Sequence, residues 1–343
     1  MKGIVWHGPE QMSVEEVPRP TVEPGTVVVR PTATGICGSE LEGYLGRMGN
    51  RTPPLVMGHE FAGTVTEVGE GVDEGLLGRV VAVNPLSSDG TCRLCRAGLT
   101  NLCPNRTLVG IHSPGGFAEY TLAPAQNVYP LPDGVEARTG ALAEPLANGV
   151  HVARLGLADG LGEVEHAVVI GGGTIGLMCL QAAVLDGIPE VHVVEPVEAR
   201  RGQALSLGAA AAHESGEEAG LALEERTEGL GVDLVIDAVG AEATRRAALD
   251  LLRPGGRVVL IGLHDDETTL GFHGVVRGQF DLQGSYAYTA EDYEQALEWL
   301  VEGKAGIGEL PPVLPLEEGP GAFANLVAGP SAQIKVFLAG SGE

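Results

Sequence analysis

Positive charge is what this sequence has least of. Its 21 lysines and arginines stand against 46 aspartates and glutamates, and lysine occurs only at Lys2, Lys304 and Lys335. The formal net charge is −25 and the isoelectric point is near 4.6. Because such a field repels phosphates, we expect neither nucleic acid nor an anionic membrane as a partner. The acidic residues are spread along the chain, which fits a salt-rich cytoplasm and also an arginine-biased genome.

Long apolar runs are also missing. No stretch is long enough to cross a bilayer, and residues 1–6 read as a strand rather than as a signal peptide. We therefore expect a cytoplasmic protein. A hydrophobic content of 44% is ordinary for a globular protein, and 343 residues exceed one ordinary core, so about two domains are expected.

Cysteine is infrequent and odd in number. The five cysteines are Cys37, Cys92, Cys95, Cys103 and Cys179. An odd count without a signal peptide does not indicate a disulfide framework. Metal binding is the better interpretation.

The pattern of residues divides the chain into two regions. Up to about residue 129, short β runs are broken by Gly and Pro, which predicts a barrel-like β domain. Strands and helices then alternate, which predicts βαβ units around a parallel sheet. We expect an α/β protein with a β domain at 1–146 and 288–343, interrupted by a Rossmann domain at 147–287. Expected strands include 25–31, 61–68, 117–122, 167–170 and 333–338, and expected helices include 149–157, 176–185 and 291–302.

The run Gly58-His59-Glu60, downstream of Cys37, is the most informative motif. Thiolate, imidazole and carboxylate are ligand types that zinc accepts together when it keeps a fourth position open for water or substrate. The neighbouring glycines allow tight turns and close backbone approach around a metal. We predict a catalytic zinc site; the alternative is a buried thiol and an unrelated core histidine on separate strands.

A glycine loop follows the expected strand 167–170. Residues 171–176 contain G-x-G-x-x-G between a strand and a helix, the context that a dinucleotide-binding loop requires. Gly171 permits the turn, Gly173 lets the backbone approach a pyrophosphate, and Gly176 packs helix on strand. With Thr174 and Ile175, these residues would place the pyrophosphate at a helix amino terminus.

Glu195 ends the next expected strand, about twenty residues beyond the loop, where an acidic residue bonds the ribose 2′-hydroxyl. A carboxylate there repels a 2′-phosphate, so we expect NAD as the cofactor. Arg200 and Arg201 could instead accept a 2′-phosphate, which keeps NADP open. A solvated charge at the strand end is the other interpretation of Glu195.

Cys92, Cys95 and Cys103 form C-x2-C-x7-C, a spacing that indicates a second metal site. Asp89 lies three residues before Cys92, and an aspartate can ligate zinc. We predict a tetrahedral, non-catalytic structural zinc held by these four residues. Alternatively, Asp89 is a loop charge and water fills the fourth position.

Together these motifs resemble those of the zinc-dependent medium-chain alcohol and polyol dehydrogenases. The resemblance covers essentially the full chain and rests on residues 35–39, 58–72, 92–103, 115–120, 144–146 and 171–176. It implies a GroES-like β-barrel catalytic domain, a Rossmann doubly wound parallel-sheet cofactor domain, and a homodimer or homotetramer. Alcohol dehydrogenases proper have cysteine at the position of Glu144, so Glu60 and Glu144 point to the polyol branch: sorbitol, galactitol-phosphate and butanediol dehydrogenases.

The same resemblance implies a zinc held by Cys37, His59 and one or both of Glu60 and Glu144. The implied reaction is NAD-dependent oxidation of a secondary alcohol of a polyol or sugar alcohol to the ketone. For Glu144, the alternative is a helix-start charge before Pro145. Other functions are a sugar or sugar-phosphate dehydrogenase using NADP, and a non-catalytic nucleotide-binding relative, which would be expected to lose the zinc ligands.

Ser39 matches the hydroxyl that relays the substrate proton in the family; the alternative is a turn serine. The family often continues the relay with a histidine five residues after the cysteine, where this chain has Glu42. Tyr44 and His112 are candidates to line the substrate pocket. Arg47 and Arg51 could hold a phosphate or carboxylate, but solvated loop charges are the favoured interpretation of both.

Overall fold

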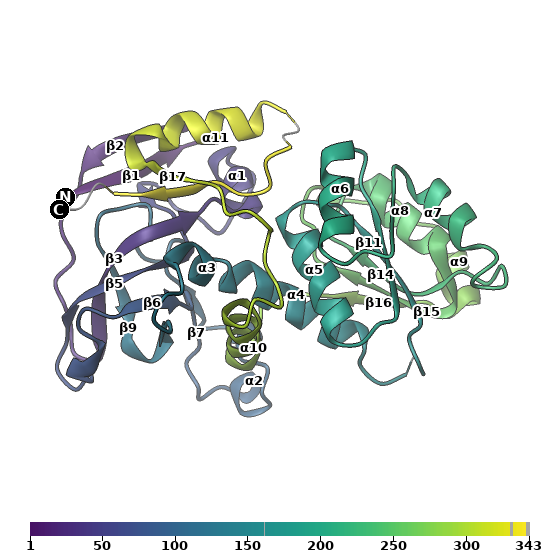
Figure 1. Cartoon of the computed structure of the whole chain (residues 1–343), viewed down its shortest axis with the longest axis horizontal. Coiled ribbons are helices and arrows are strands. Elements are labelled where there is room, and N and C mark those ends of the chain that lie inside the picture. The colour runs from purple at the N-terminus through teal and green to yellow at the C-terminus, as the bar shows by residue number, and fades with distance from the viewer. Residues whose placement is uncertain (161, 330–331, 341–343) are drawn as a thin grey trace. The chain divides into compact units, whose positions relative to one another are not determined.

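The computed structural model describes residues 1–160, 162–329 and 332–340, and the chain divides into two compact units. The first unit comprises Met1–Glu144, Thr289–Lys304 and Glu309–Glu343, and the second comprises Pro145–Tyr288 and Ala305–Gly308. In Figure 1 the first unit accordingly contains both the purple amino-terminal strands and the yellow carboxy-terminal segments, while the second is teal and green.

The first unit is built mainly from antiparallel strands. A seven-stranded sheet runs in the order β10-β6-β5-β3-β18-β17, with β9 also beside β3, and a second sheet has the order β2-β1-β4. The strands are β1 (Lys2–Gly8), β2 (Gln11–Glu16), β3 (Thr26–Gly35), β4 (Leu55–Val56), β5 (Glu60–Val68), β6 (Val80–Val83), β9 (Thr121–Pro124), β10 (Val128–Pro130), β17 (Val313–Pro315) and β18 (Phe337–Ala339), with the separate pair β7 (Leu86–Ser87) and β8 (Thr107–Leu108).

The long strands β3 and β5 form the centre of this sheet. Val27 and Val29 of β3 pack with Phe61 and Val65 of β5 in one buried cluster. β-Branched and aromatic side chains favour such a pleated, buried surface. The register pairs Gly35 with Glu60, which joins the end of β3 to the start of β5.

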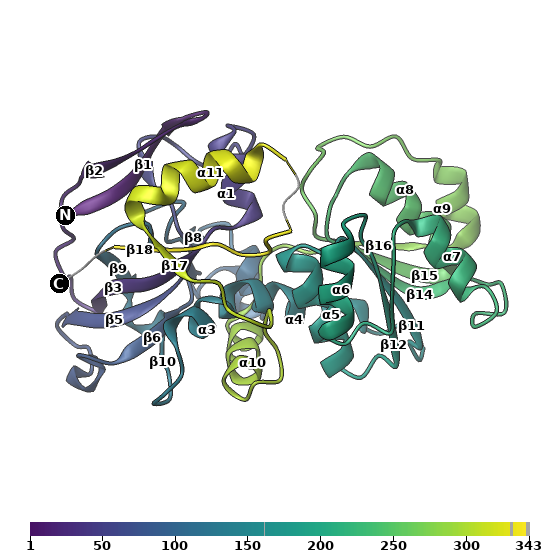
Figure 2. The same ribbon diagram turned by 45° about the horizontal axis from the view of Figure 1, so that its top comes forward.

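Short helices complete the first unit: α1 (Gly38–Tyr44), α2 (Arg93–Arg96), α3 (Ala137–Ala141), α10 (Ala290–Val301) and α11 (Gly319–Val327). Helix α11 lies beside α1 in both views, although they come from opposite ends of the chain (Figures 1 and 2). Phe323 of α11 packs against Tyr44 of α1 and against Phe117, with ring centroids 5.7 Å apart in both pairs. These aromatic contacts join the carboxy-terminal segment to the amino-terminal strands.

The second unit is a six-stranded parallel sheet in the order β13-β12-β11-β14-β15-β16. Its elements are α4 (Ala143–Gly156, which begins at the unit boundary), β11 (His166–Ile170), α5 (Thr174–Leu185), β12 (Glu190–Val194), α6 (Glu198–Ser206), β13 (Ala211–His213), α7 (Gly216–Leu223), β14 (Val232–Asp237), α8 (Glu242–Leu251), β15 (Leu252–Leu260), α9 (Phe272–Gly278) and β16 (Asp281–Gly284). Helices α5 and α6 cover one face of the sheet, and α7 and α8 cover the other (Figure 1). All of β14 is therefore buried, as expected for a parallel strand between two helical layers.

Three expected elements differ clearly from the structure. The strand expected at 333–338 is limited to β18 at Phe337–Ala339, and residues 333–336 are not part of a strand. The strand expected at 117–122 is shifted to Thr121–Pro124, because Phe117 contacts two other segments instead of extending one ladder: its amide donates to Met57 and its carbonyl accepts from Ile4. The helix expected at 149–157 begins earlier, at Ala143. Pro145 lies in its first turn, where a missing N–H costs no helical hydrogen bond.

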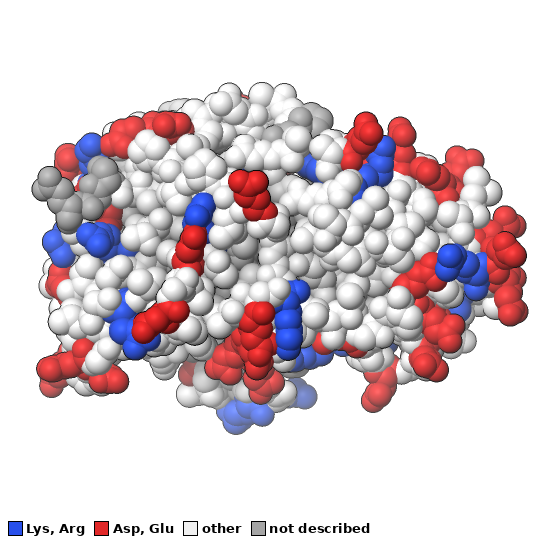
Figure 3. All heavy atoms as spheres, viewed as in Figure 1, with Lys and Arg blue, Asp and Glu red and all other residues white. Residues whose placement is uncertain are grey.

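The surface carries the acidic excess. On the face drawn in Figure 3, acidic side chains lie at many separate places, with lysine and arginine among them. Within the described ranges, none of the helices combines the length and apolar character that spanning a bilayer requires.

Candidate functional site

The end of β3 and the start of β5 bring three possible metal ligands together. Cys37 precedes α1, two residues after β3 ends, and His59 and Glu60 stand where β5 begins. One ligand atom each from Cys37, His59 and Glu60 lies within 4.8 Å of the others. His59 and Glu60 are 4% and 1% exposed, so the donors face an interior site. This soft-plus-hard set of donors fits zinc.

Gly58 is required by the backbone at this site. Its φ of +103° lies in the region that L side chains rarely adopt, and an added Cβ would lie 2.6 Å from the amide nitrogen of Phe117. Any other residue would therefore shift the segment that carries His59.

Glu40 is a functional residue that the sequence reasoning missed. Its Oε1 lies 2.9 Å from Nδ1 of His59 and accepts hydrogen bonds from the amides of Gly58 and His59 at 2.8 and 3.2 Å. Its Oε2 accepts from the amide of Cys37 at 3.1 Å. Glu40 thereby fixes the imidazole and leaves Nε2 for a metal, which is the usual arrangement of a zinc-binding histidine. Its position, three residues after Cys37 in the first helical turn, was the available signal.

The charged forms of Glu40 and His59 stabilise each other. Burial opposes ionisation of Glu40, but the charge of His59, the Cys37 amide and Arg51 outweigh it and lower the pKa of Glu40. Burial likewise opposes the imidazolium form, while the charges of Glu40 and Cys37 raise the pKa of His59 well above its ordinary value. The lowered pKa favours the ionised form of Glu40, which accepts from Nδ1 of His59, and Nε2 would be the atom that binds a metal.

Lys335, next to β18, is a second residue that the sequence reasoning missed. It is 3% exposed, forms an ion pair with Oε2 of Glu60, and donates to the carbonyl of Ile36 at 3.2 Å. Burial acts to lower the pKa of Lys335, but the charges of Glu60, Cys37 and Glu144 outweigh burial and raise it. A lysine within the apolar run 334–338 was the signal that could have identified it.

Glu144 lies in the first turn of α4 and is 6% exposed. Within the described residues, the ligand group around Cys37 contains Glu60 but not Glu144. The charge of Glu144 nevertheless contributes to the raised pKa of Lys335 and of buried Tyr293. Glu144 therefore lies near the site, outside its closest group of donors.

Ser39 also lies at the site. Its hydroxyl is 3.4 Å from the sulfur of Cys37 and accepts a hydrogen bond from the guanidinium of Arg51 at 3.2 Å. Glu42, at the position where relatives often have histidine, forms an ion pair with Arg47 at 3.4 Å. The hydroxyl of Ser39 thus donates to the sulfur of Cys37 and accepts from Arg51, and Glu42 is engaged with Arg47.

The three substrate candidates lie in different environments. Tyr44 is 7% exposed in the core, and its hydroxyl donates to the carbonyl of Glu10 at 3.3 Å. Arg47 has a side chain that is 59% exposed. The Nδ1 of His112 accepts from the amide of Leu108 within its own loop, at 3.0 Å. The structure brings none of the three into the group of Cys37, His59 and Glu60.

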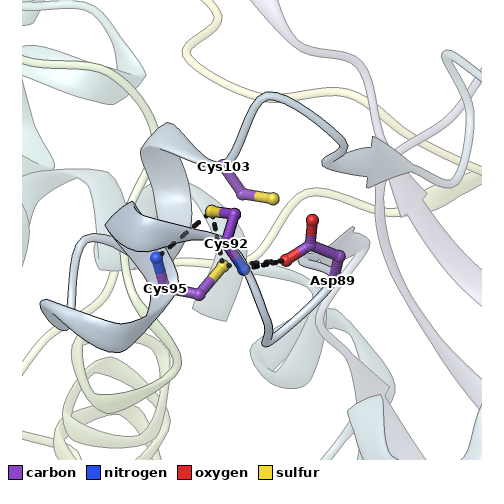
Figure 4. A group of neighbouring side chains, drawn as sticks. All are labelled: Asp89, Cys92, Cys95 and Cys103. Carbon is purple, nitrogen blue, oxygen red and sulfur yellow. Dashed lines mark hydrogen bonds between the residues drawn. The ribbon is translucent and has the colours of Figure 1, made fainter.

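The second possible metal site lies in the loop that contains α2. Asp89, Cys92, Cys95 and Cys103 direct one donor atom each toward a common centre, within 4.8 Å of one another (Figure 4). Oδ1 of Asp89 accepts from the amides of Thr91 and Cys92 at 2.8 and 2.9 Å and lies 3.4 Å from the sulfur of Cys95. Three thiols and a carboxylate in this arrangement fit a closed zinc site.

These four donors interact with one another and with nearby amides. Hydrogen bonds from the Cys92 amide and from Asn105 hold the pKa of Asp89 far below its usual range. The amide of Cys95 lowers the pKa of Cys92, while burial and the neighbouring thiols raise the pKa of Cys95 to about 11. Hydrogen bonds thus favour the ionised forms of Asp89 and Cys92, whereas burial and the neighbouring thiols oppose ionisation of Cys95.

The glycine loop of the second unit joins β11 to α5. Gly171 has a φ of +104°, and a Cβ on Gly176 would collide with the carbonyl of Gly171. A Cβ on Gly173 would meet no atom within 4 Å, so the backbone is open where α5 begins. The turn, the open position and the close packing fit the three roles of G-x-G-x-x-G.

Glu195, just after β12, is hydrogen-bonded to this loop. It is 4% exposed, and its two carboxylate oxygens accept from the amides of Gly172 and Val197 at 2.8 and 2.9 Å. Arg200 approaches the same carboxylate at 3.8 Å. Arg201 instead donates to the carbonyls of Glu195 and Pro196, both at 2.8 Å.

Comparison with known proteins identifies the family. The profile of the alcohol dehydrogenase GroES-like domain matches residues 23–133, and that of the zinc-binding dehydrogenases matches residues 174–302. A 2-dehydro-3-deoxy-L-galactonate 5-dehydrogenase of Pseudoalteromonas atlantica is 33% identical, over 86% of both chains. D-xylulose reductase A of Aspergillus niger is 32% identical, over 98% of this chain and 96% of the relative.

A solved structure gives the same result. An alcohol dehydrogenase of Escherichia coli CFT073, crystallised with NADH, superposes with a TM-score of 0.87 at 28% identity and covers 99% of both chains. The sequence expectation of a GroES-like domain combined with a Rossmann domain is confirmed. With the clustered thiolate, imidazole and carboxylate, these matches show that the chain is an oxidoreductase of the zinc-binding medium-chain alcohol dehydrogenase family.

Proposed function

We propose that this protein is a cytoplasmic, NAD-dependent enzyme that reversibly oxidises a secondary alcohol of a polyol or sugar alcohol to the ketone. The observation that carries the proposal is the buried group of Cys37, His59 and Glu60, oriented by Glu40. The first unit would serve as the zinc-binding catalytic domain and the second as the cofactor domain. A relative that acts on a pentulose, D-xylulose reductase, supports the substrate class.

Each residue of the candidate site has a separate role in this proposal. Cys37, His59 and Glu60 would hold a zinc ion, which supplies a Lewis acid that lowers the pKa of an alcohol hydroxyl. Ser39, beside Cys37, is placed to take the proton of that hydroxyl. Glu40 keeps His59 in one tautomer. Membership of Glu60 in the closest donor group supports it as the third ligand, with Glu144 as an alternate carboxylate.

Asp89, Cys92, Cys95 and Cys103 would hold a second, structural zinc. The convergence of their donors supports this proposal. In the second unit, Gly171, Gly173 and Gly176 would bind the pyrophosphate together with Thr174 and Ile175. The carboxylate of Glu195 at the loop supports NAD, whereas the similar solved structures hold NADH in one case and NADP in another.

A second candidate is a sugar or sugar-phosphate dehydrogenase that uses NADP. The observation in its favour is Arg200, whose guanidinium lies 3.8 Å from Glu195 and could meet a 2′-phosphate. Comparing kcat/KM for NAD and NADP decides between them; a clear preference for NADP would replace the first assignment of the cofactor.

We also propose that two copies associate through β16. This strand ends the sheet order of the second unit, and an exposed strand edge is a template for pairing with another chain. Large apolar side chains lie exposed in the segments next to it: Leu263, Phe272, Val276 and Tyr286, at 62%, 64%, 75% and 38% exposure. The edge strand and the exposed apolar side chains together support a homodimer, or a tetramer of such dimers.

One experiment tests the main proposal. The protein is incubated with NAD or NADP and a panel of polyols, diols, sugars and their phosphates, with and without a chelator, and its zinc content is measured in parallel. We expect chelator-sensitive formation of reduced cofactor and close to two zinc ions per chain. If no alcohol gives metal-sensitive turnover, the proposed function is wrong; one zinc per chain would leave the Asp89 site empty.

A further inference from the structure

Arg51 is a buried arginine with unused hydrogen-bonding capacity. It is 6% exposed; one terminal nitrogen donates to Asn50 at 3.1 Å and the other to Ser39 at 3.2 Å. Its Nε is buried and has no acceptor within the described residues. Among the described residues its guanidinium forms no ion pair, and its charge acts on Glu40 only at longer range, where it helps to lower the pKa of Glu40.

A second buried arginine in the same chain shows what a purely structural role looks like. Arg257 is 7% exposed, pairs with Asp281 at 2.7 Å, and donates to the carbonyls of Leu155, Gly156, Ala158 and Asp159. Buried charges are normally paired in this way, because an unpaired buried charge is costly. Arg51 lacks such a set of acceptors.

Nearby acidic groups are already engaged. Both oxygens of Glu40 are bonded to His59 and to three backbone amides. Glu42 pairs with exposed Arg47, and Glu60 pairs with Lys335. Arg51 is thus the buried cation of this site whose charge is least neutralised by direct contacts.

The position of Arg51 relates it to substrate. It donates to the hydroxyl of Ser39, which in turn lies 3.4 Å from the sulfur of Cys37. Arg51 cannot be the terminus of a proton relay, because a guanidinium has no acceptor site and does not deprotonate in proteins. An alcohol held beside Cys37 and Ser39 would instead present its neighbouring substituents to the guanidinium.

We propose that the substrate is an anionic alcohol, carrying a carboxylate or a phosphate a short distance from the reacting carbon, and that Arg51 binds this group. A planar guanidinium with free donors matches either oxyanion. This inference rests on the proposed dehydrogenase function and narrows its substrate class from polyols in general to acidic ones.

The first test uses the wild-type, zinc-loaded enzyme and three alcohols with one carbon skeleton: the neutral polyol, the acid with a terminal carboxylate, and the terminal phosphate. We expect kcat/KM for at least one anionic member to exceed that of the neutral polyol by about 10- to 100-fold, the range of a charged hydrogen bond. The carboxylate and phosphate arms show which oxyanion is preferred. Equal or better turnover of the neutral polyol overturns the inference.

The second test uses variants. Arg51→Gln should raise KM for the anionic substrate about 10- to 100-fold more than KM for the neutral polyol, whereas any change of kcat that acts through Ser39 should be the same for both substrates. Arg51→Lys should fall between wild type and Arg51→Gln, because an ammonium cannot bind bidentately. The matched control is Arg19→Gln, an exposed arginine paired with Glu67. Calorimetric titration of anionic substrate without dinucleotide should show the same loss of affinity. Equal loss of kcat for both substrate types, with no difference between them in the change of KM, would mean that Arg51 acts only by positioning Ser39.

Arg47→Gln tests the neighbouring exposed arginine. If it raises KM for the anionic substrate more than Arg51→Gln does, the inference is also overturned. If Arg51→Gln does not fold or bind zinc, the wild-type series and Arg51→Lys decide the question. Failure of this inference is distinct from failure of the proposed function. Turnover of neutral polyols alone rejects only the anionic substrate, whereas absence of zinc-dependent turnover of every alcohol rejects the dehydrogenase assignment.

Discussion

Two buried side chains outside the expected ligand set, Glu40 and Lys335, balance charge around Cys37, His59 and Glu60. Glu40 provides a carboxylate for His59, and Lys335 provides an ammonium for Glu60. His59 and Glu60 thus each have a partner of opposite charge. In the low dielectric of a protein interior, such pairing decides whether the donors stay ionised in place.

Replacing Glu40 by Gln should weaken zinc binding at the Cys37 site about 10- to 100-fold, because His59 loses the carboxylate that fixes its ring and raises its basicity. Competition with a chromophoric chelator measures this affinity. Glu42→Gln is the control, since that carboxylate pairs with exposed Arg47. An unchanged zinc affinity in Glu40→Gln would show that the contact with His59 has no role in metal binding.

Replacing Lys335 by Met should destabilise the zinc-free first unit by about 3–5 kcal/mol, because Glu60 becomes a buried carboxylate without its cation. The double variant Glu60→Gln/Lys335→Met should recover much of this loss. Both tryptophans, Trp6 and Trp299, lie in the first unit, so their fluorescence during urea unfolding reports on it. A free energy of unfolding equal to that of wild type would contradict the pairing.

The sequence motifs predicted the donors, and the structure brings Cys37, His59 and Glu60 together. Lys335 could not be predicted, because it meets its partners only through folding: Lys335 and Ile36 are 299 residues apart. Arg47 and Arg51 looked alike in sequence, and only burial separates them. Local spacing thus reveals ligands on one turn, whereas a counter-ion from a distant strand leaves no local pattern.

At the scale of elements, the loop around α2 has little apolar packing of its own. It is connected by the short strands β7 and β8, and Leu99 and Leu102 within it are 43% and 41% exposed. A metal held by Asp89, Cys92, Cys95 and Cys103 would supply the cross-link that the missing core does not.

Cys103→Ser should therefore lower zinc content from two ions to one per chain and make residues 88–106 the first site of proteolytic cleavage. The change removes one of three thiolates, and loss of a structural zinc exposes the loop. Cys179→Ala is the control, because Cys179 is buried in α5 of the second unit and should leave zinc content unchanged. Zinc content measured by atomic absorption and limited proteolysis give the readouts; two zinc ions in Cys103→Ser would exclude the site.

A pair of stacked histidines joins β12 to β13. Nδ1 of His192 lies 2.9 Å from Nε2 of His213, and Nε2 of His192 lies 2.8 Å from Glu190. Burial lowers the pKa of His213, the charge of His192 lowers it further, and Glu218 offsets part of the effect. His213 therefore resists protonation in the folded second unit.

Because the pKa of His213 is lowered in the folded state, the stability of the protein should depend on pH near neutrality. Above the ordinary histidine pKa, both states are neutral at His213; as pH falls through about 6.5, the unfolded state gains a proton that the folded state resists, so stability falls. His213→Gln should flatten this part of the curve of Tm against pH. His273→Gln, at an exposed position of α9, should leave it as in wild type. Identical slopes in wild type and His213→Gln would contradict the assignment.

Elements with strong periodicity were predicted well, as in the helix expected at 291–302, which the structure places at Ala290–Val301. The strand expected at 117–122 was wrong in position because Gly115 and Gly116 pack against the backbone and side chains of other segments. That packing depends on close approach between distant segments of the same chain, which the alternation of hydrophobic and polar residues does not predict.

At the scale of the whole molecule, a net charge of −25 opposes association of two copies, so any interface must overcome it. The apolar side chains near β16 offer such a surface.

Val276→Asp, in α9, should shift the protein from dimer to monomer, because a carboxylate would lie in an apolar interface. Leu221→Asp, at a 68% exposed position of α7, is the control. Light scattering after gel filtration at low and high salt measures the mass; a monomeric wild type at both would exclude the dimer.

The pairing of β3 with β18 has a consequence for synthesis of the chain. A ribosome adds about 5–20 residues per second, so the partner strand of β3 emerges many seconds after it. During that interval the end of β3, at Thr34 and Gly35, lacks its partner β18, and Glu60 lacks its ammonium, while every strand of the second unit can already leave the exit tunnel. The second unit can therefore fold first, and Glu60 gains its ammonium only after every strand of that unit has been synthesised.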